Sequence, residues 1–133
     1  DTVRALADTF TTSLTATAIR LVEEGGLPSM LICSDETGRR SWFARSPIVP
    51  KELWPKQQPG RSTAAHALLK GASPGDPMDV DADEWIEHPG SDRYVVREHS
   101  MKAGVVVLTL LWWKDESQLT DLVDREDADE REP

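Results

Sequence analysis

The feature that most constrains the fold is the stretch VVVLTLLWW at residues 105–113, in which eight of nine residues are apolar. A helix needs about 20 consecutive apolar residues to cross a bilayer, and Lys114, Asp115 and Glu116 follow this stretch directly. We therefore exclude a membrane-spanning helix here. Consecutive β-branched valines followed by leucines and tryptophans are typical of a strand with both faces covered. The stretch predicts the central strand of a sheet, and burial within one chain is favoured over a role in completing an interface.

Residues 1–26 predict a pair of helices joined by a short turn. In the first helix an apolar face is formed by Val3, Leu6, Ala7 and Phe10. Thr and Ser at residues 11–13 predict the turn, and Gly25-Gly26 ends the second helix. This is the spacing of a helix-turn-helix.

DNA binding by this helical pair is disfavoured by its charge. The exposed positions of the second helix include Thr15, Thr17 and Arg20, which are able to contact DNA, but the pair carries a net charge of −2. A DNA reader normally presents a positive surface to the phosphates. We therefore predict that the pair packs against a neighbouring domain.

Residues 27–114 predict a single α+β domain. A hairpin is expected from residue 29 to 45, a proline-rich loop at 46–60, a short helix at 62–71 and three further strands. Because few helices separate the strands, the sheet should be mainly antiparallel, with the helix and the loops covering it. The length of 133 residues suits one domain, and the single cysteine, Cys33, allows no internal disulfide and favours a reducing compartment.

Charge is distributed in blocks along the chain, whose net charge is −9. Residues 39–70 carry +6, residues 71–92 carry −7 and residues 114–133 carry −6. The composition of the C-terminal block predicts a solvated, disordered tail at 115–133. The chain begins on Asp without an initiator methionine, so we expect it to be a fragment of a longer protein.

The basic block contains Trp42, Phe43 and Trp54 among its seven Lys and Arg residues. Such a mixture is used for backbone contact and base stacking on nucleic acids. It also suits an anionic small ligand or an acidic protein partner. We favour a third interpretation, in which the block pairs with the acidic block at 71–92, because the two charges are nearly equal and opposite.

Catalytic and metal motifs are absent from the sequence. The three histidines, His66, His88 and His99, have no metal-ligand spacing, and neither HExxH nor CxxC occurs. Cys33 falls within a predicted strand, where a cysteine is usually a small buried apolar residue. Glu98 and His99 are adjacent on a strand and should point to opposite faces. We expect no catalysis, metal or cofactor in this chain.

Three segments together resemble the C-terminal part of ImmA/IrrE-type metallopeptidases: ALADTFTTSLTATAIRLVEEG, WFARSP and VLTLLWW. The helical signature of that family is matched by Leu6-Ala7, Phe10, Ser13 and Arg20-Leu21, and residues 42–47 match the hairpin that follows it. The resemblance covers about residues 3–113. The zinc motif of the family is missing, so no peptidase residue is carried over and zinc is expected only in a preceding domain.

The resemblance implies a cytoplasmic regulatory or sensor domain, similar to GAF domains, in a stress-response protein that acts on a helix-turn-helix repressor. GAF-like domains bind small molecules between the sheet and its cover. We therefore predict a pocket for a small anionic effector, lined by Trp42, Arg45, His66, Trp85, Tyr94 and Glu98. The alternative is a docking module for a repressor or for a sister subunit in a homodimer. DNA binding is less favoured, and no membrane partner is expected.

Overall fold

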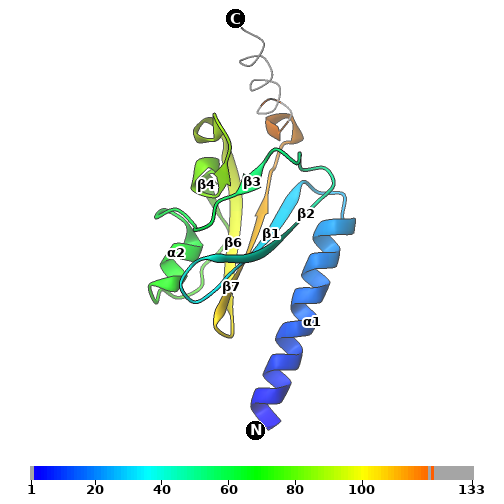
Figure 1. Ribbon diagram of the computed structural model, residues 1–133, viewed down its shortest axis with the longest axis vertical. Coiled ribbons are helices and arrows are strands. Elements are labelled where there is room, and N and C mark those ends of the chain that lie inside the picture. Colours follow the sequence, from blue (N-terminus) through cyan, green and yellow to red (C-terminus); the bar gives the residue numbers. More distant parts are fainter. Residues whose placement is uncertain (1, 120, 122–133) are drawn as a thin grey trace, which may run out of the picture.

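The computed structural model describes residues 2–119 and 121, with the backbone alone at residues 3, 4, 6–8, 10 and 11. The fold is α+β, as predicted: a long helix, a five-stranded antiparallel sheet, a second sheet of two strands and several short helices (Figure 1). The likeness to GAF domains remains a prediction.

The N-terminal helix α1 (Thr2–Glu24) is continuous, so the predicted pair of helices with a turn at residues 11–13 is wrong. Thr and Ser each lower helix propensity by less than about 1 kcal/mol, and neither Gly nor Pro occurs before Gly25 to stop the helix. The 23 residues span about 35 Å, and the N-terminal end projects beyond the sheet (Figure 1). An apolar face was predicted for Val3, Leu6, Ala7 and Phe10. The structure describes only the backbone of these four residues.

The main sheet has the strand order β2-β1-β7-β6-β4, with every neighbouring pair antiparallel. Its strands are β1 (Ser29–Ser34), β2 (Arg40–Arg45), β4 (Met78–Asp81), β6 (Val95–Ala103) and β7 (Val106–Trp112). The apolar stretch that opened the sequence analysis forms the central strand β7, which confirms that prediction. Val105 itself lies in the turn before β7, beside Gly104, whose φ of 66° is one that glycine adopts without strain.

One face of this sheet, here called the core face, is covered over its central strands, while Met78 at its β4 edge is 36% exposed. Five of its side chains are 0% exposed: Met30, Ile32, Val107, Thr109 and Leu111. The cover consists of α2 (Ala64–Leu69), the small sheet of β3 (Trp54–Pro55) and β5 (Ile86–Glu87), and the 3-10 helices η1 (Ala82–Glu84) and η2 (Ser91–Arg93). The core of the domain lies between these layers.

The opposite face, here called the α1 face, is covered only in part. Helix α1 packs over β1 and β2 (Figure 1), so Leu31 and Cys33 of β1 are buried while Leu110 and Trp112 of β7 remain partly exposed. The sequence analysis predicted that both faces of β7 are covered. The structure covers one face fully and the other incompletely.

The folded domain extends past residue 114, where it was predicted to end. Residues 116–119 are helical, and Leu119 is 2% exposed within the hydrophobic core. Leu119 is therefore a core residue within an acidic segment, which the charge pattern did not indicate. The remainder of the predicted tail, residues 120 and 122–133, lies outside the described residues.

Candidate functional site

The structure does not bring the six predicted pocket residues together. They lie on β2 (Trp42, Arg45), on α2 (His66), beside η1 (Trp85), before β6 (Tyr94) and on β6 (Glu98). Directly opposed residues of an antiparallel pair point to the same face. Trp42 pairs with Cys33 on the α1 face, whereas Arg45 pairs with Met30 on the core face. The six side chains therefore do not line one pocket.

Glu98 has a structural role in the core. It is 0% exposed, and its carboxylate accepts hydrogen bonds from the backbone N–H groups of Ala64 (2.9 Å) and Ala65 (2.8 Å) and from the Ser100 hydroxyl (2.6 Å). The Ser100 and Thr109 hydroxyls are themselves 2.7 Å apart. The two amides belong to the first turn of α2, whose orphan N–H groups favour a negative partner. Glu98 therefore holds α2 against the sheet.

The other three predicted residues are dispersed around α2 and η1. Trp85 is 1% exposed and belongs to the core. Tyr94 packs against the core, and its hydroxyl donates to the Asp121 carboxylate. The backbone N–H of His66 donates to Thr63 Oγ1 (3.0 Å), which caps α2.

Arg45 belongs instead to a surface cluster, here called the arginine–aromatic cluster, of Arg40, Phe43, Arg45 and Trp54. Phe43 and Trp54 pack edge to face with ring centroids 4.9 Å apart. The Arg40 guanidinium carbon lies 5.2 Å from the Phe43 centroid and 5.8 Å from that of Trp54. For Arg45 these distances are 5.2 and 5.3 Å. All four contacts are within the range of cation–π attraction.

Both guanidiniums of the arginine–aromatic cluster are oriented by the proline-rich loop. Arg40 donates to the carbonyl of Pro55, and Arg45 donates to that of Pro50 at 2.9 Å. Burial lowers the pKa of the Arg45 guanidinium, and the charge of Glu52 opposes this effect to a smaller extent. The side chains are thus held in place but keep further N–H donors, since a guanidinium has five.

The predicted pairing of the basic block with the acidic block is not observed among the described residues. The ion pairs there join Asp79 to Arg97 (3.1 Å) and to Lys114 (3.6 Å), and neither base belongs to residues 39–70. Asp79 lies on β4, at the opposite edge of the sheet from β2. The basic block at 39–70 and the acidic block at 71–92 therefore have nearly opposite charges but form no described ion pair with each other.

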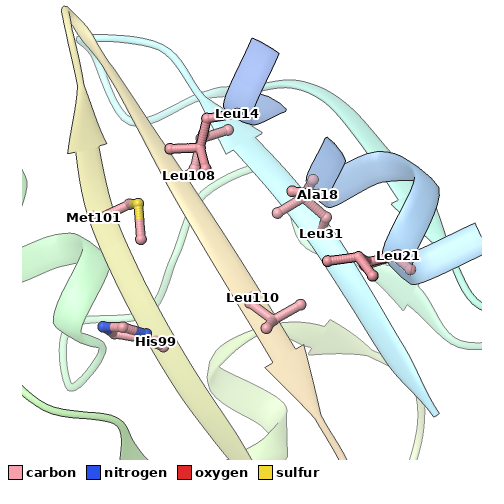
Figure 2. A pocket seen from close by; sticks show the side chains of 9 residues that line it. Leu14, Ala18, Leu21, Leu31, His99, Met101, Leu108 and Leu110 are labelled. Carbon is pink, nitrogen blue, oxygen red and sulfur yellow. The ribbon is translucent and has the colours of Figure 1, made fainter. Parts of the chain in front are cut away.

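A second surface is the groove between α1 and the sheet, here called the α1 groove (Figure 2). Its lining consists of Leu14, Ala18, Leu21, Val22, Leu31, His99, Met101, Leu108 and Leu110. The groove continues along α1 past Leu27 and Ser29 to Trp112. The exposed fractions of Leu14, Leu21 and Met101 are 41%, 68% and 37%. This is an extended apolar surface that water reaches.

The described residues hold no cluster of three or more His, Cys, Asp or Glu side chains suited to a metal ion. Glu98 and His99 point to opposite faces, as predicted, because Glu98 pairs with Leu111 and His99 with Leu110. Cys33 is buried, also as predicted, and burial, more than the nearby Asp35, raises the pKa of its thiol. Within the described part of the chain, no helix has the length and apolar character needed to cross a membrane.

Comparisons with known proteins add no assignment, since no family model, curated protein or solved structure matches the chain. The resemblance to ImmA/IrrE-type proteins therefore rests on the sequence segments alone.

Sequence reasoning located part of each surface. The basic and aromatic composition of residues 39–70 indicated the arginine–aromatic cluster, but the pairing of Phe43 with Trp54 depends on how the loop folds back. The α1 groove left a weaker signal, the repeat of Leu14, Ala18 and Leu21 on one side of the helix. We interpreted that repeat as a face that would be covered.

Proposed function

We propose that this chain is a non-catalytic docking module that binds one amphipathic helix of a protein partner in the α1 groove. The observation that carries this proposal is the incomplete cover of the α1 face. Apolar side chains of α1, β6 and β7 line a continuous groove that none of the described residues fills. Exposed contiguous apolar surfaces of this kind usually mark binding sites.

The width of the uncovered sheet suits a helix. Neighbouring strands are about 4.8 Å apart, so β7 and β6 lie about 5 and 10 Å beyond β1. Packed helices are about 8–10 Å apart. A second helix alongside α1 would therefore lie over β7 and β6, where it would contact the exposed Met101 and the partly exposed Leu110.

The chemistry of the lining suits an apolar helix face. Of the groove residues, His99 and Ser29 alone have polar side chains. Grooves of this type bind amphipathic helices through apolar residues spaced at i, i+3, i+4 and i+7. Because helix and groove are both apolar, affinity should come from buried area and depend little on salt.

The wider setting that we propose is the regulatory end of an ImmA/IrrE-like protein in the cytoplasm, with its helix-turn-helix repressor as the docking partner. Support for this setting comes from the sequence resemblance. The docking alternative is favoured over a small anionic effector, because the six predicted effector residues do not converge. DNA binding is disfavoured because α1 is one helix and not a helix-turn-helix.

A pair of equally exposed apolar residues provides the test. Met101 in the α1 groove and Ile48 in the proline-rich loop outside it are both 37% exposed, so replacement by Glu should be tolerated similarly at both. We expect Met101→Glu to weaken binding of a leucine-rich amphipathic helical peptide by about tenfold or more, since a carboxylate would be buried unpaired. Ile48→Glu should leave the affinity unchanged. Isothermal titration calorimetry measures both.

A scrambled peptide of the same composition, without an apolar face, serves as the second control and should not bind. Failure of the amphipathic peptide to bind, or equal losses with both variants, would contradict the proposal. Self-association of the chain that Met101→Glu abolishes would identify the partner as a sister subunit.

A further inference from the structure

We propose that the arginine–aromatic cluster is a second binding site, which recognises an acidic peptide segment of a protein partner through its carboxylates. The site lies at the β2 edge of the sheet, with Phe43 and Arg45 on the core-face side and α1 on the other side. It is separate from the α1 groove, so the failure of one proposal leaves the other standing.

The first argument is that the two arginines are positioned without an ion pair among the described residues, although the charge of the exposed Glu52 acts on Arg45 to a smaller extent. Each gives one described hydrogen bond to a loop carbonyl, and within the described residues neither guanidinium forms an ion pair with a carboxylate. Remaining N–H donors in a fixed planar fork match the geometry of a carboxylate. The two side chains are therefore ordered before a ligand binds, so that binding costs less conformational entropy.

The second argument is the exposure of Trp54. Trp54 is 49% exposed although its side chain is large and apolar, and its ring lies within about 6 Å of both guanidinium carbons and packs against Phe43. An exposed aromatic side chain next to arginines is the composition of interface hot spots. A peptide lying across Trp54 would bury this apolar area while its carboxylates reach the arginines.

The third argument is the local charge. Lys51 follows Pro50 and Lys56 follows Pro55, so a base flanks each carbonyl that orients an arginine, and Arg39 is exposed beside Arg40. Glu52 is the one acid of residues 39–70. The partial burial that lowers the pKa of Arg45 also strengthens its attraction to an anion, because water screens it less.

An acidic peptide is favoured over a nucleic acid. The chain as a whole carries −9, and residues 71–92 alone carry −7. A polyphosphate chain would meet this repulsion over its length, since the cluster offers only a local positive area. A short acidic segment needs no more than the two arginines, the flanking lysines and Trp54.

The experiment is a calorimetric titration of the 133-residue chain with a peptide of alternating Glu and Gly, with the Gln analogue as neutral control. We expect the Glu peptide to bind, with affinity falling as salt rises. Arg40→Ala and Arg45→Ala should each weaken binding by about tenfold or more, as the loss of a charged hydrogen bond does. Arg61→Ala, at an exposed base of the same block outside the cluster, should change it by less than about threefold.

Because Arg40 and Arg45 also hold the loop, two milder variants keep the test decisive. Arg45→Lys retains the charge but not the planar fork, and Trp54→Ala removes a half-exposed side chain that contacts Phe43 at the surface. Both should weaken binding while the chain still unfolds in one cooperative thermal transition. Equal affinity for the Glu and Gln peptides, unchanged affinity in these variants, or tighter binding of duplex DNA than of the peptide would overturn the proposal.

Discussion

The two faces of the main sheet are built from similar apolar residues but differ in how far their side chains are exposed to solvent. Leu111 on the core face is 0% exposed, whereas its neighbour Leu110, on the α1 face, is partly exposed. Glu98 and His99 show the same alternation, one fully buried and the other in the groove. Strand composition therefore does not decide which face becomes the core. The elements that cover each face do.

The covers differ in number and in how they are attached. The core face is closed by α2, the small sheet and two short helices, and the buried Glu98 carboxylate fixes α2 through two backbone amides. The α1 face has one helix, which lies over β1 and β2 at one side of the sheet. We infer that the core face provides most of the stability, and the binding that we propose would use the α1 face.

The largest expected effect comes from breaking the attachment of α2. Glu98→Ala leaves the amides of Ala64 and Ala65 without their acceptor in the core, and should lower the free energy of unfolding by about 3–5 kcal/mol. Glu98→Gln keeps one acceptor and should cost less. Urea denaturation measures both, and the exposed Glu36→Ala is the control. A cost below about 1 kcal/mol for Glu98→Ala would show that α2 is held by other contacts.

A smaller effect separates the two faces on one strand. Leu111→Ala should lower the free energy of unfolding by about 2–5 kcal/mol, because it leaves a closed cavity in the core. Leu110→Ala should cost about 1 kcal/mol or less, because the groove is open and part of the side chain is already hydrated. Equal costs in urea denaturation would mean that the α1 face is covered as completely as the core face.

The smallest effect concerns pH and the exposed ion pair of Asp79. The hydrogen bond from Arg97 is the main cause that lowers the pKa of Asp79 in the folded chain. A lowered folded-state pKa stabilises the fold above the unfolded-state pKa, and this contribution disappears as the pH falls through the folded-state value. Asp79→Asn should therefore be slightly less stable than the parent chain near neutral pH and equally stable in strong acid. Urea midpoints of the variant and the parent chain, measured from about pH 2 to about pH 7, check this. A difference between the two midpoints that stays constant with pH would refute it.

Much of the fold was predictable from local pattern. The strands at residues 29–34, 40–45 and 106–112, the helix capped by Thr63 and the central place of β7 all follow from hydrophobic runs and turn residues. The turn predicted at residues 11–13 does not occur, because Thr and Ser lower helix stability without ending a helix. Leu119 was missed because one apolar residue in an acidic segment gives no periodic signal.

The sites were less predictable than the fold, because they depend on contacts between distant segments. Glu98 was expected in a pocket, yet its carboxylate meets amides more than thirty residues away in the chain. Trp42 and Arg45 are three residues apart and point to opposite faces, a consequence of strand alternation that composition alone does not reveal. Trp54 meets Phe43 only because the proline-rich loop folds back over β2.

The most direct test of the contrast between the faces is methionine oxidation followed by mass spectrometry. Met30 at the centre of the core face is 0% exposed, and Met101 in the α1 groove is 37% exposed. Met78, at the β4 edge of the core face and outside the groove, is 36% exposed. We predict that Met101 and Met78 oxidise at similar rates and Met30 far more slowly. Addition of the amphipathic helical peptide should then slow Met101 alone. A free chain in which Met101 is as protected as Met30, or a peptide that protects Met78 equally, would contradict the account.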